Sequence, residues 1–144
     1  MIRLLLTLAD SLRHKARRRV WSRDLASGRR GEDLAHRFLQ ERGLRIVARN
    51  YRARSGGGEI DLVAWERDTL VFVEVKARST EEFGAPERAV DREKRLALVH
   101  AAREYARRAN VEWRHIRFDV VSVILGDPPT LAHIKDAFAP GLGL

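Results

Sequence analysis

Residues 59–77 have the sequence EIDLVAWERDTLVFVEVKA, in which two apolar-rich runs flank a short polar segment. The runs cover Glu59–Ala64 and Leu70–Ala77, and the polar segment covers Glu66–Thr69. Such a pattern is typical of a β-hairpin. Because strand side chains alternate between faces, one face of this hairpin is uniformly apolar and is expected to be core: Ile60, Leu62, Ala64, Val71, Val73 and Val75.

The opposite face of the predicted hairpin carries charged residues. With a turn at Glu66–Thr69, the ladder places Asp61 opposite Glu74, and Lys76 follows Glu74 on the same face. The part of this face nearer the turn is apolar, so we expect it to be covered as well. Two shielded carboxylates raise each other's pKa or recruit a cation, and Mg²⁺ prefers oxygen ligands.

Two features around the hairpin bear on this interpretation. On the preceding helix, Glu32 falls nearer the apolar stripe than Asp33, so Glu32 is expected to reach the edge of the sheet and Asp33 to face solvent. In the same register Glu59 opposes Lys76, and a solvated cross-strand ion pair is an ordinary surface feature. The pattern alone therefore leaves a metal site and a salt-bridge cluster equally open.

The rest of the chain predicts an α/β domain around one mixed sheet. The elements are a helix with apolar positions from Leu34 to Leu39 that stops at Gly43, a strand over 44–49, a glycine-rich loop over 52–58, the hairpin, a polar connection over 78–87, a helix over 90–109, a strand over 116–125 and an element of undetermined type over 131–138. The order is helix, three strands, helix, strand.

The net charge of +8 over 144 residues is concentrated near the start of the chain. Residues 13–30 hold eight basic side chains and one acid, whereas residues 31–144 hold 19 basic and 18 acidic ones. Residues 1–27 are interpreted as a basic extension, partly disordered or helical, ahead of one domain over 28–144. Such an arm suits nucleic acid, a solvated tail, or docking on a membrane or protein.

Other classes of protein are excluded by composition. The absence of Cys rules out a disulfide scaffold and a thiolate zinc site, and it fits a cytoplasmic location. The sequence contains no run of 18 apolar residues, so no transmembrane span is predicted. The glycine triplet precedes a strand and is not a P-loop, and the His residues lack zinc spacing.

Several blocks together resemble a known family. An acid on a helix, an Asp, a spacer and Glu-x-Lys in a hairpin resemble the PD-(D/E)xK nuclease superfamily, whose restriction-endonuclease-like core has the order α-β-β-β-α-β with a mixed sheet flanked by helices. More closely, the sequence is similar to the bacterial YraN family, thought to be related to archaeal Holliday-junction resolvases. The resemblance covers about residues 28–138 and is carried by Gly31-Glu32, Arg49–Arg52, Gly58–Ala64, Val71–Arg78 and Arg117–Val120.

This resemblance implies a site and a cofactor. Glu32, Asp61, Glu74 and the Val75 main-chain carbonyl would bind Mg²⁺ or Mn²⁺, and Lys76 would be the catalytic lysine beside Asp61 and Glu74. Lys94 matches a basic position that could contact phosphate, although a solvated helix residue explains it equally well. Asp119 receives no chemical role and is expected to be a buried structural acid.

The acid-free basic stretch before the glycine loop supplies candidates for nucleic-acid contacts: Arg45, Arg49, Arg52 and Arg54. The leading hypothesis is an Mg²⁺-dependent endonuclease that hydrolyses phosphodiester bonds of DNA, including branched or repair intermediates. The alternative is a nucleic-acid-binding protein of the same fold that does not cut. Retention of the acids favours the first, because binding alone needs no acidic pocket beside phosphates. A homodimer would follow by analogy with resolvases.

Overall fold

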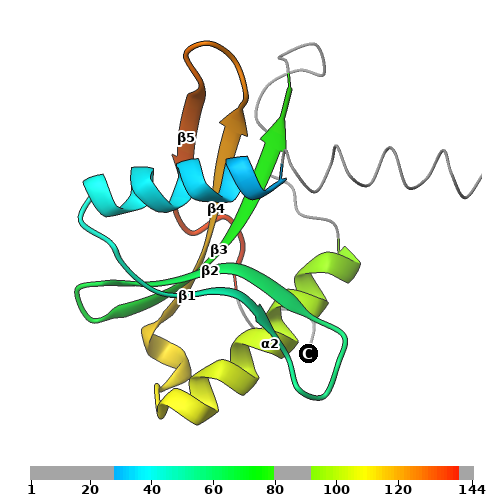
Figure 1. The fold of residues 1–144 in the computed structure, drawn as a ribbon. Helices are drawn as coiled ribbons and strands as arrows, with labels where there is room; N and C mark the ends of the chain where they lie inside the picture. Colours follow the sequence, from blue (N-terminus) through cyan, green and yellow to red (C-terminus); the bar gives the residue numbers. More distant parts are fainter. Residues whose placement is uncertain (1–27, 80–91, 140–144) are drawn as a thin grey trace, which may run out of the picture.

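The computed structural model describes residues 28–79 and 92–139 of the chain (Figure 1). A helix covers residues 28–41. It is followed by β1 (Arg45–Arg52), β2 (Glu59–Glu66), β3 (Thr69–Arg78), α2 (Arg92–Ala109), the short 3₁₀ helix η2 (Trp113–His115), β4 (Ile116–Ile124) and β5 (Thr130–Ile134). The predicted α/β order is confirmed, and the C-terminal element of undetermined type is a fifth strand. The predicted extension over 1–27 lies outside the described residues, as does most of the predicted connection over 78–87.

The five strands form one mixed sheet in the order β1-β2-β3-β4-β5. Neighbouring strands are antiparallel except β3 and β4, which are parallel. Parallel neighbours need a long crossover connection, and α2 lies within it. In the hairpin, Trp65 pairs with Leu70, as the sequence predicts, and the strands also include the pair Glu66 and Thr69, which the sequence assigned to the turn.

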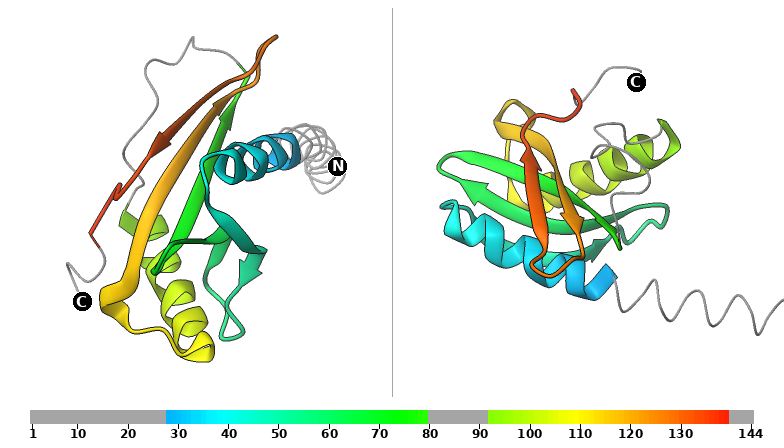
Figure 2. Two further views of the ribbon diagram at one scale, coloured as in Figure 1. Left: turned by 90° about the vertical axis from the view of Figure 1, so that its left-hand side faces the viewer. Right: turned by 90° about the horizontal axis from the view of Figure 1, so that it is seen from above.

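Both faces of the sheet are covered, which confirms the expectation for the charged face of the hairpin. The helix over 28–41 packs on the face formed by residues such as Leu62, Val73 and Val121. α2 packs on the other face, against residues such as Phe72 and Phe118. Seen from above, the two helices lie on opposite sides of β2 and β3 (Figure 2, right). Of the helices in the described ranges, none is long and apolar enough to cross a membrane.

Gly31 brings the N-terminal helix directly onto β3. A Cβ atom at this position would lie 2.6 Å from the Cβ of Ala77. Only glycine permits this approach. Because Glu32 is the next residue, the close contact also fixes where that carboxylate can reach along β3.

A buried polar cluster joins β5 to β4. The guanidinium of Arg117 donates to Asp119 from Nε at 2.8 Å and from Nη2 at 2.9 Å, and His133 Nε2 lies 2.7 Å from the same carboxylate. The backbone N–H of Asp136 donates a further bond. Burial alone would raise the pKa of Asp119, but these hydrogen bonds outweigh burial and the pKa is lowered. Asp119 is therefore the buried structural acid expected from the sequence.

Replacing Gly31 by alanine should destabilise the fold. The new methyl group would overlap Ala77, so we expect Gly31→Ala to lower the free energy of unfolding by about 1–3 kcal/mol, measured by urea denaturation. The matched control is Gly28→Ala in the same helix, where a Cβ would meet no atom within 4 Å. Alanine there should be neutral or stabilising by up to about 1 kcal/mol. Equal effects of the two variants would contradict the packing argument.

Candidate metal centre

The β2–β3 ladder stops where the acidic residues begin. Paired residues run from Glu66↔Thr69 to Leu62↔Val73, and the next pair would be Asp61 and Glu74. Instead of backbone pairing, Oδ2 of Asp61 accepts a hydrogen bond of 2.8 Å from the backbone N–H of Val75. The Asp61 carboxyl group thus accepts a hydrogen bond from the β3 backbone at the open end of the hairpin.

Asp61 and Glu74 lie together in a shielded position. Glu74 is only 4% exposed, and the two carboxyl groups share a hydrogen bond. Burial raises the pKa of Asp61, and repulsion from Glu74 and Glu32 raises it further. The Val75 N–H acts in the opposite direction, and the resulting pKa of Asp61 is about 8. Burial and the neighbouring acids therefore favour the protonated form of the Asp61 carboxyl.

Lys94 contacts the same pair from α2. Its ammonium group forms an ion pair with Oε1 of Glu74, although the Lys94 side chain is 51% exposed. The sequence marked Lys94 for phosphate contact and contained no signal for this partner, because α2 and β3 meet only through tertiary packing. One cation thus already lies beside the buried carboxylates.

Glu32 approaches from the opposite helix. Its side chain is 17% exposed whereas that of Asp33 is 62% exposed, which confirms the contrast predicted from helical geometry. Arg49 Nη2 lies 3.7 Å from Glu32 and 2.8 Å from Asp33. Burial and Glu74 are the main causes of the raised pKa of Asp61, and the charge of Glu32 adds to them. Arg49, predicted to contact nucleic acid, forms ion pairs with these two acids.

Lys76 and Val75 follow Glu74 along β3. Alternation places Lys76 on the face of Glu74, and its neighbour in the parallel ladder is Ser122 of β4. Ser122 is buried, and its hydroxyl has no hydrogen-bond partner among the described residues. Sequence reasoning missed Ser122, because one serine within a β-branched strand carries no distinguishing signal.

The acids do not by themselves form a complete ligand cage. Within residues 28–79 and 92–139, no three His, Cys, Asp or Glu side chains are grouped closely enough to hold a metal ion. The hydrogen-bonded pair of Asp61 and Glu74 is the part of the predicted site that the structure brings into direct contact.

The remaining predicted arginines lie on β1 and the loop after it. Arg45 and Arg52 are exposed, and Arg52 Nε lies 3.7 Å from a carboxylate oxygen of Glu59. The ladder ends before the Glu59–Lys76 pairing considered from the sequence. Arg54 has an exposed side chain, and its backbone N–H donates to both carboxylate oxygens of Glu104 at 3.0 Å.

The loop after β1 is docked on α2. The Tyr51 hydroxyl donates to Glu104, and the Tyr51 ring packs edge-on against Tyr105 with centroids 5.1 Å apart. Ser55 Oγ and His100 Nε2 are 2.7 Å apart. Tyr51 is therefore engaged in packing within the domain.

Comparison with known proteins places these residues in a family context. The model of the Uncharacterised protein family UPF0102 matches residues 31–123, a range that includes Glu32, the hairpin and α2. A UPF0102 protein of Solibacter usitatus is 54% identical over 138 residues, which are 96% of this chain and all of the relative. One from Rhodococcus opacus is 44% identical over 80% of this chain and 98% of its own length.

A more distant UPF0102 protein, from Persephonella marina, is 35% identical over 77% of this chain and 91% of its own length. The range matched by the family model includes Glu32, the hairpin and α2. The chain therefore belongs to the UPF0102 family, the YraN family that its sequence blocks resemble.

Proposed function

We propose that this protein is a divalent-metal-dependent endonuclease that hydrolyses phosphodiester bonds of DNA. The observation that carries the proposal is the shielded position of the Asp61 and Glu74 carboxyl groups at the end of the β2–β3 ladder, with Lys76 two residues after Glu74 on β3. A buried carboxylate pair costs free energy, so a fold that retains one at a strand end suggests a functional use. UPF0102 membership is consistent with this proposal.

The donor chemistry of the pair fits Mg²⁺ or Mn²⁺. Carboxylate oxygens are hard ligands, and a divalent cation would compensate the repulsion that now raises the pKa of Asp61. Glu32 and the Val75 main-chain carbonyl are the further ligands we propose. When bound, the metal would activate a water molecule and neutralise charge on the leaving oxygen.

The chain's own cations would act on the phosphate. Lys76 would stabilise negative charge at phosphorus or position the attacking water, which is an electrostatic role. Lys94 forms an ion pair with Glu74. Once a metal ion compensates the charge of Glu74, the Lys94 ammonium group would contact the same phosphate. The exposed Arg45, Arg52 and Arg54 would contact the backbone next to the cut.

A second candidate is a nucleic-acid-binding module that does not cut. The observation that favours it is the charge balance: Lys94 contacts Glu74 and Arg49 contacts Glu32, so two of the acids have protein cations beside them. In that case the acids would stabilise the fold, and DNA would bind without hydrolysis.

Cleavage should depend on the assigned residues. Linear, nicked and four-way DNA are incubated with the full chain and Mg²⁺ or Mn²⁺. We expect Asp61→Asn, Glu74→Gln and Lys76→Ala each to reduce the cleavage rate by about 100-fold or more, since each removes a ligand or charge needed in the transition state. The controls are Asp33→Asn and Lys135→Ala, two exposed residues of matched type, which should retain most activity.

Cleavage that survives all three substitutions would refute the assigned site. DNA binding without cutting on any substrate, with either metal, would favour the binding module instead.

Removing the Asp61 charge should stabilise the metal-free fold. Because folding raises the pKa of Asp61, its contribution to stability is fully present below the unfolded pKa of about 3.9 and is lost as pH rises toward 8. Asparagine can still accept from Val75. In EDTA at pH 8 we therefore expect Asp61→Asn to be about 0.5–2 kcal/mol more stable than wild type in urea, with the gap closing near pH 4.

Wild type and Asp61→Asn also test whether Asp61 binds a metal ion. Mn²⁺ or Mg²⁺ at pH 8 should raise the thermal midpoint of wild type and leave that of Asp61→Asn nearly unchanged. A variant less stable than wild type at pH 8, or equal metal shifts in both proteins, would contradict the assignment.

A further inference from the structure

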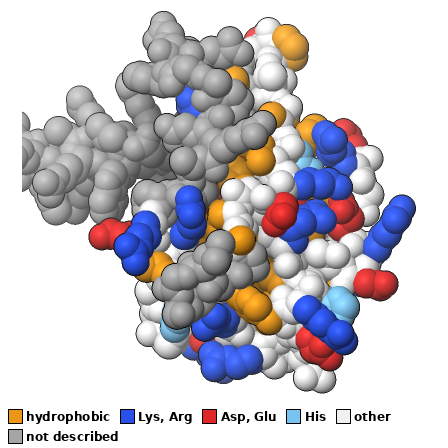
Figure 3. All heavy atoms as spheres, turned by 180° about the vertical axis from the view of Figure 1, so that it is seen from behind, with side chains coloured by type: hydrophobic (Ala, Val, Ile, Leu, Met, Phe, Trp, Pro, Cys, Tyr) orange, Lys and Arg blue, Asp and Glu red, His pale blue; other side chains and the backbone are white. Residues whose placement is uncertain are grey.

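Positive charge is spread over the surface in several groups. Seen from behind the view of Figure 1, Lys and Arg side chains form separate clusters, some with acidic side chains beside them (Figure 3). Charge alone therefore does not locate a second site. A site needs basic groups that are not already neutralised and a concave surface that can receive a ligand.

α2 meets the first requirement. Its 18 residues contain six basic side chains and two acidic ones, Glu93 and Glu104. Glu104 already accepts hydrogen bonds from Tyr51 and from the Arg54 backbone. Sequence reasoning marked only Lys94 on this helix, because a basic run on an exposed helix face is usually just solvated.

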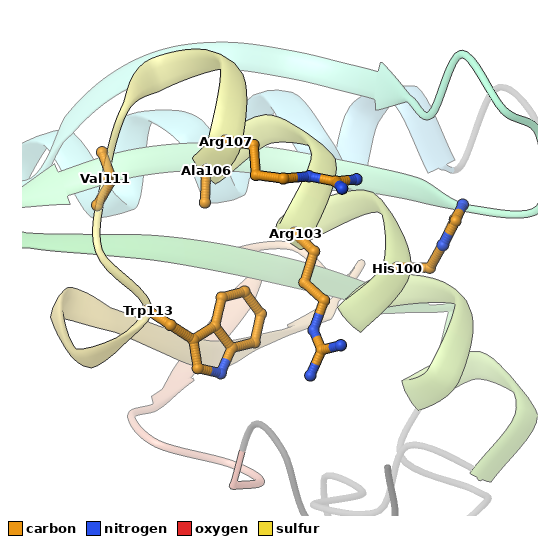
Figure 4. Close-up of a pocket in the computed structure, with 6 residues that line it drawn as sticks. All are labelled: His100, Arg103, Ala106, Arg107, Val111 and Trp113. Carbon is orange, nitrogen blue, oxygen red and sulfur yellow. The ribbon is translucent and has the colours of Figure 1, made fainter.

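A pocket of about 730 Å³ meets the second requirement. It is lined by His100, Arg103, Ala106 and Arg107 of α2 and by Val111 and Trp113, which follow the helix (Figure 4). Its volume lies within the range of ordinary ligand sites. The pocket is separate from the acidic pair, since none of Asp61, Glu74 and Lys76 lines it.

The two arginines of this pocket are not paired with acids of the described residues. In the part of the chain that the structure describes, neither Arg103 nor Arg107 has an ion pair with a carboxylate. The Arg103 guanidinium stacks over the Trp113 ring at 5.2 Å, which orients it beside an aromatic wall. Oriented guanidinium groups bind phosphate oxygens well, because they donate two parallel hydrogen bonds.

The helix sets the distance between this pocket and the proposed cutting site. Lys94, at the start of α2, contacts Glu74, whereas Arg103 and Arg107 follow nine and thirteen residues later. At 1.5 Å per residue they lie about 13 Å and 20 Å further along the helix axis. At about 100° per residue their side chains also leave the helix roughly 180° and 220° around its axis from Lys94, so the pocket and the Glu74 contact lie on different sides of α2.

We propose that the pocket of Arg103, Arg107 and Trp113 binds the phosphate backbone of a DNA duplex at a site separate from the scissile bond. This inference rests on the proposed endonuclease function for its geometry. It assigns a DNA-binding role to α2 residues outside the metal centre and makes α2 a spacer between cutting and anchoring.

The test measures DNA binding in EDTA, where no metal-dependent cutting occurs. The full chain, Arg103→Ala/Arg107→Ala and Arg37→Ala/Arg42→Ala are titrated with a blunt duplex longer than one helical turn at several salt concentrations. The last variant is the matched control, since it removes two exposed arginines from the helix over 28–41 and the turn that follows it, on the other face of the sheet.

We expect the pocket variant to weaken binding by about tenfold or more and to reduce the slope of log affinity against log salt by about two, because about 0.9 counterion is released per phosphate contact. The control should leave the slope unchanged. Arg103→Lys/Arg107→Lys retains the charges and should retain the slope, which separates a charge effect from damage to the fold.

Equal losses in the pocket variant and the control would overturn the inference, as would an unchanged slope in the pocket variant or a reduced slope in the lysine variant. The two proposals fail separately. Binding that depends on Arg103 and Arg107 without any cleavage would remove only the endonuclease, whereas cleavage dependent on Asp61 with unaltered binding by the pocket variant would remove only this inference.

Discussion

The site depends on one costly interaction, the burial of the Asp61 carboxyl beside Glu74 at the end of the β2–β3 ladder. Burial and like charge together would force the strands apart if nothing compensated them. The compensation visible in the structure is the Val75 N–H and the nearby ammonium of Lys94. Each of these comes from a different element, so the pair requires β2, β3 and α2 to be placed together.

The surrounding packing provides that placement. Gly31 lets the N-terminal helix contact Ala77, which brings Glu32 toward the same strand end from the other face. Gly58 performs the matching role for α2, since a Cβ there would lie 2.3 Å from the Ala97 carbonyl oxygen. The acidic pair therefore lies between two close helix contacts, one on each side of the sheet.

The shielded acids Asp119 and Asp61 differ in how many hydrogen-bond donors and cations surround their carboxyl groups. Asp119 is buried but accepts bonds from Arg117, His133 and a backbone N–H, so it stays ionised and stabilises β4 and β5. Asp61 is shielded from water and has one backbone donor and two neighbouring acids, so burial and repulsion together raise its pKa. Burial alone therefore does not distinguish a structural acid from a candidate metal ligand. The number of hydrogen-bond donors around the carboxyl group does.

The sequence by itself determined the local geometry. The alternation in residues 59–77 predicted the hairpin register from Trp65–Leu70 to Leu62–Val73, because side chains on a pleated strand repeat every two residues. Helical spacing likewise separated Glu32 from Asp33. Only the tertiary structure decided the contact of Lys94 with Glu74, the capture of Arg49 by two acids, the fifth strand and the pocket beside Trp113. Those contacts join elements far apart in the chain, and their distances follow from how closely helices and sheet pack, which periodicity along one strand or helix does not encode.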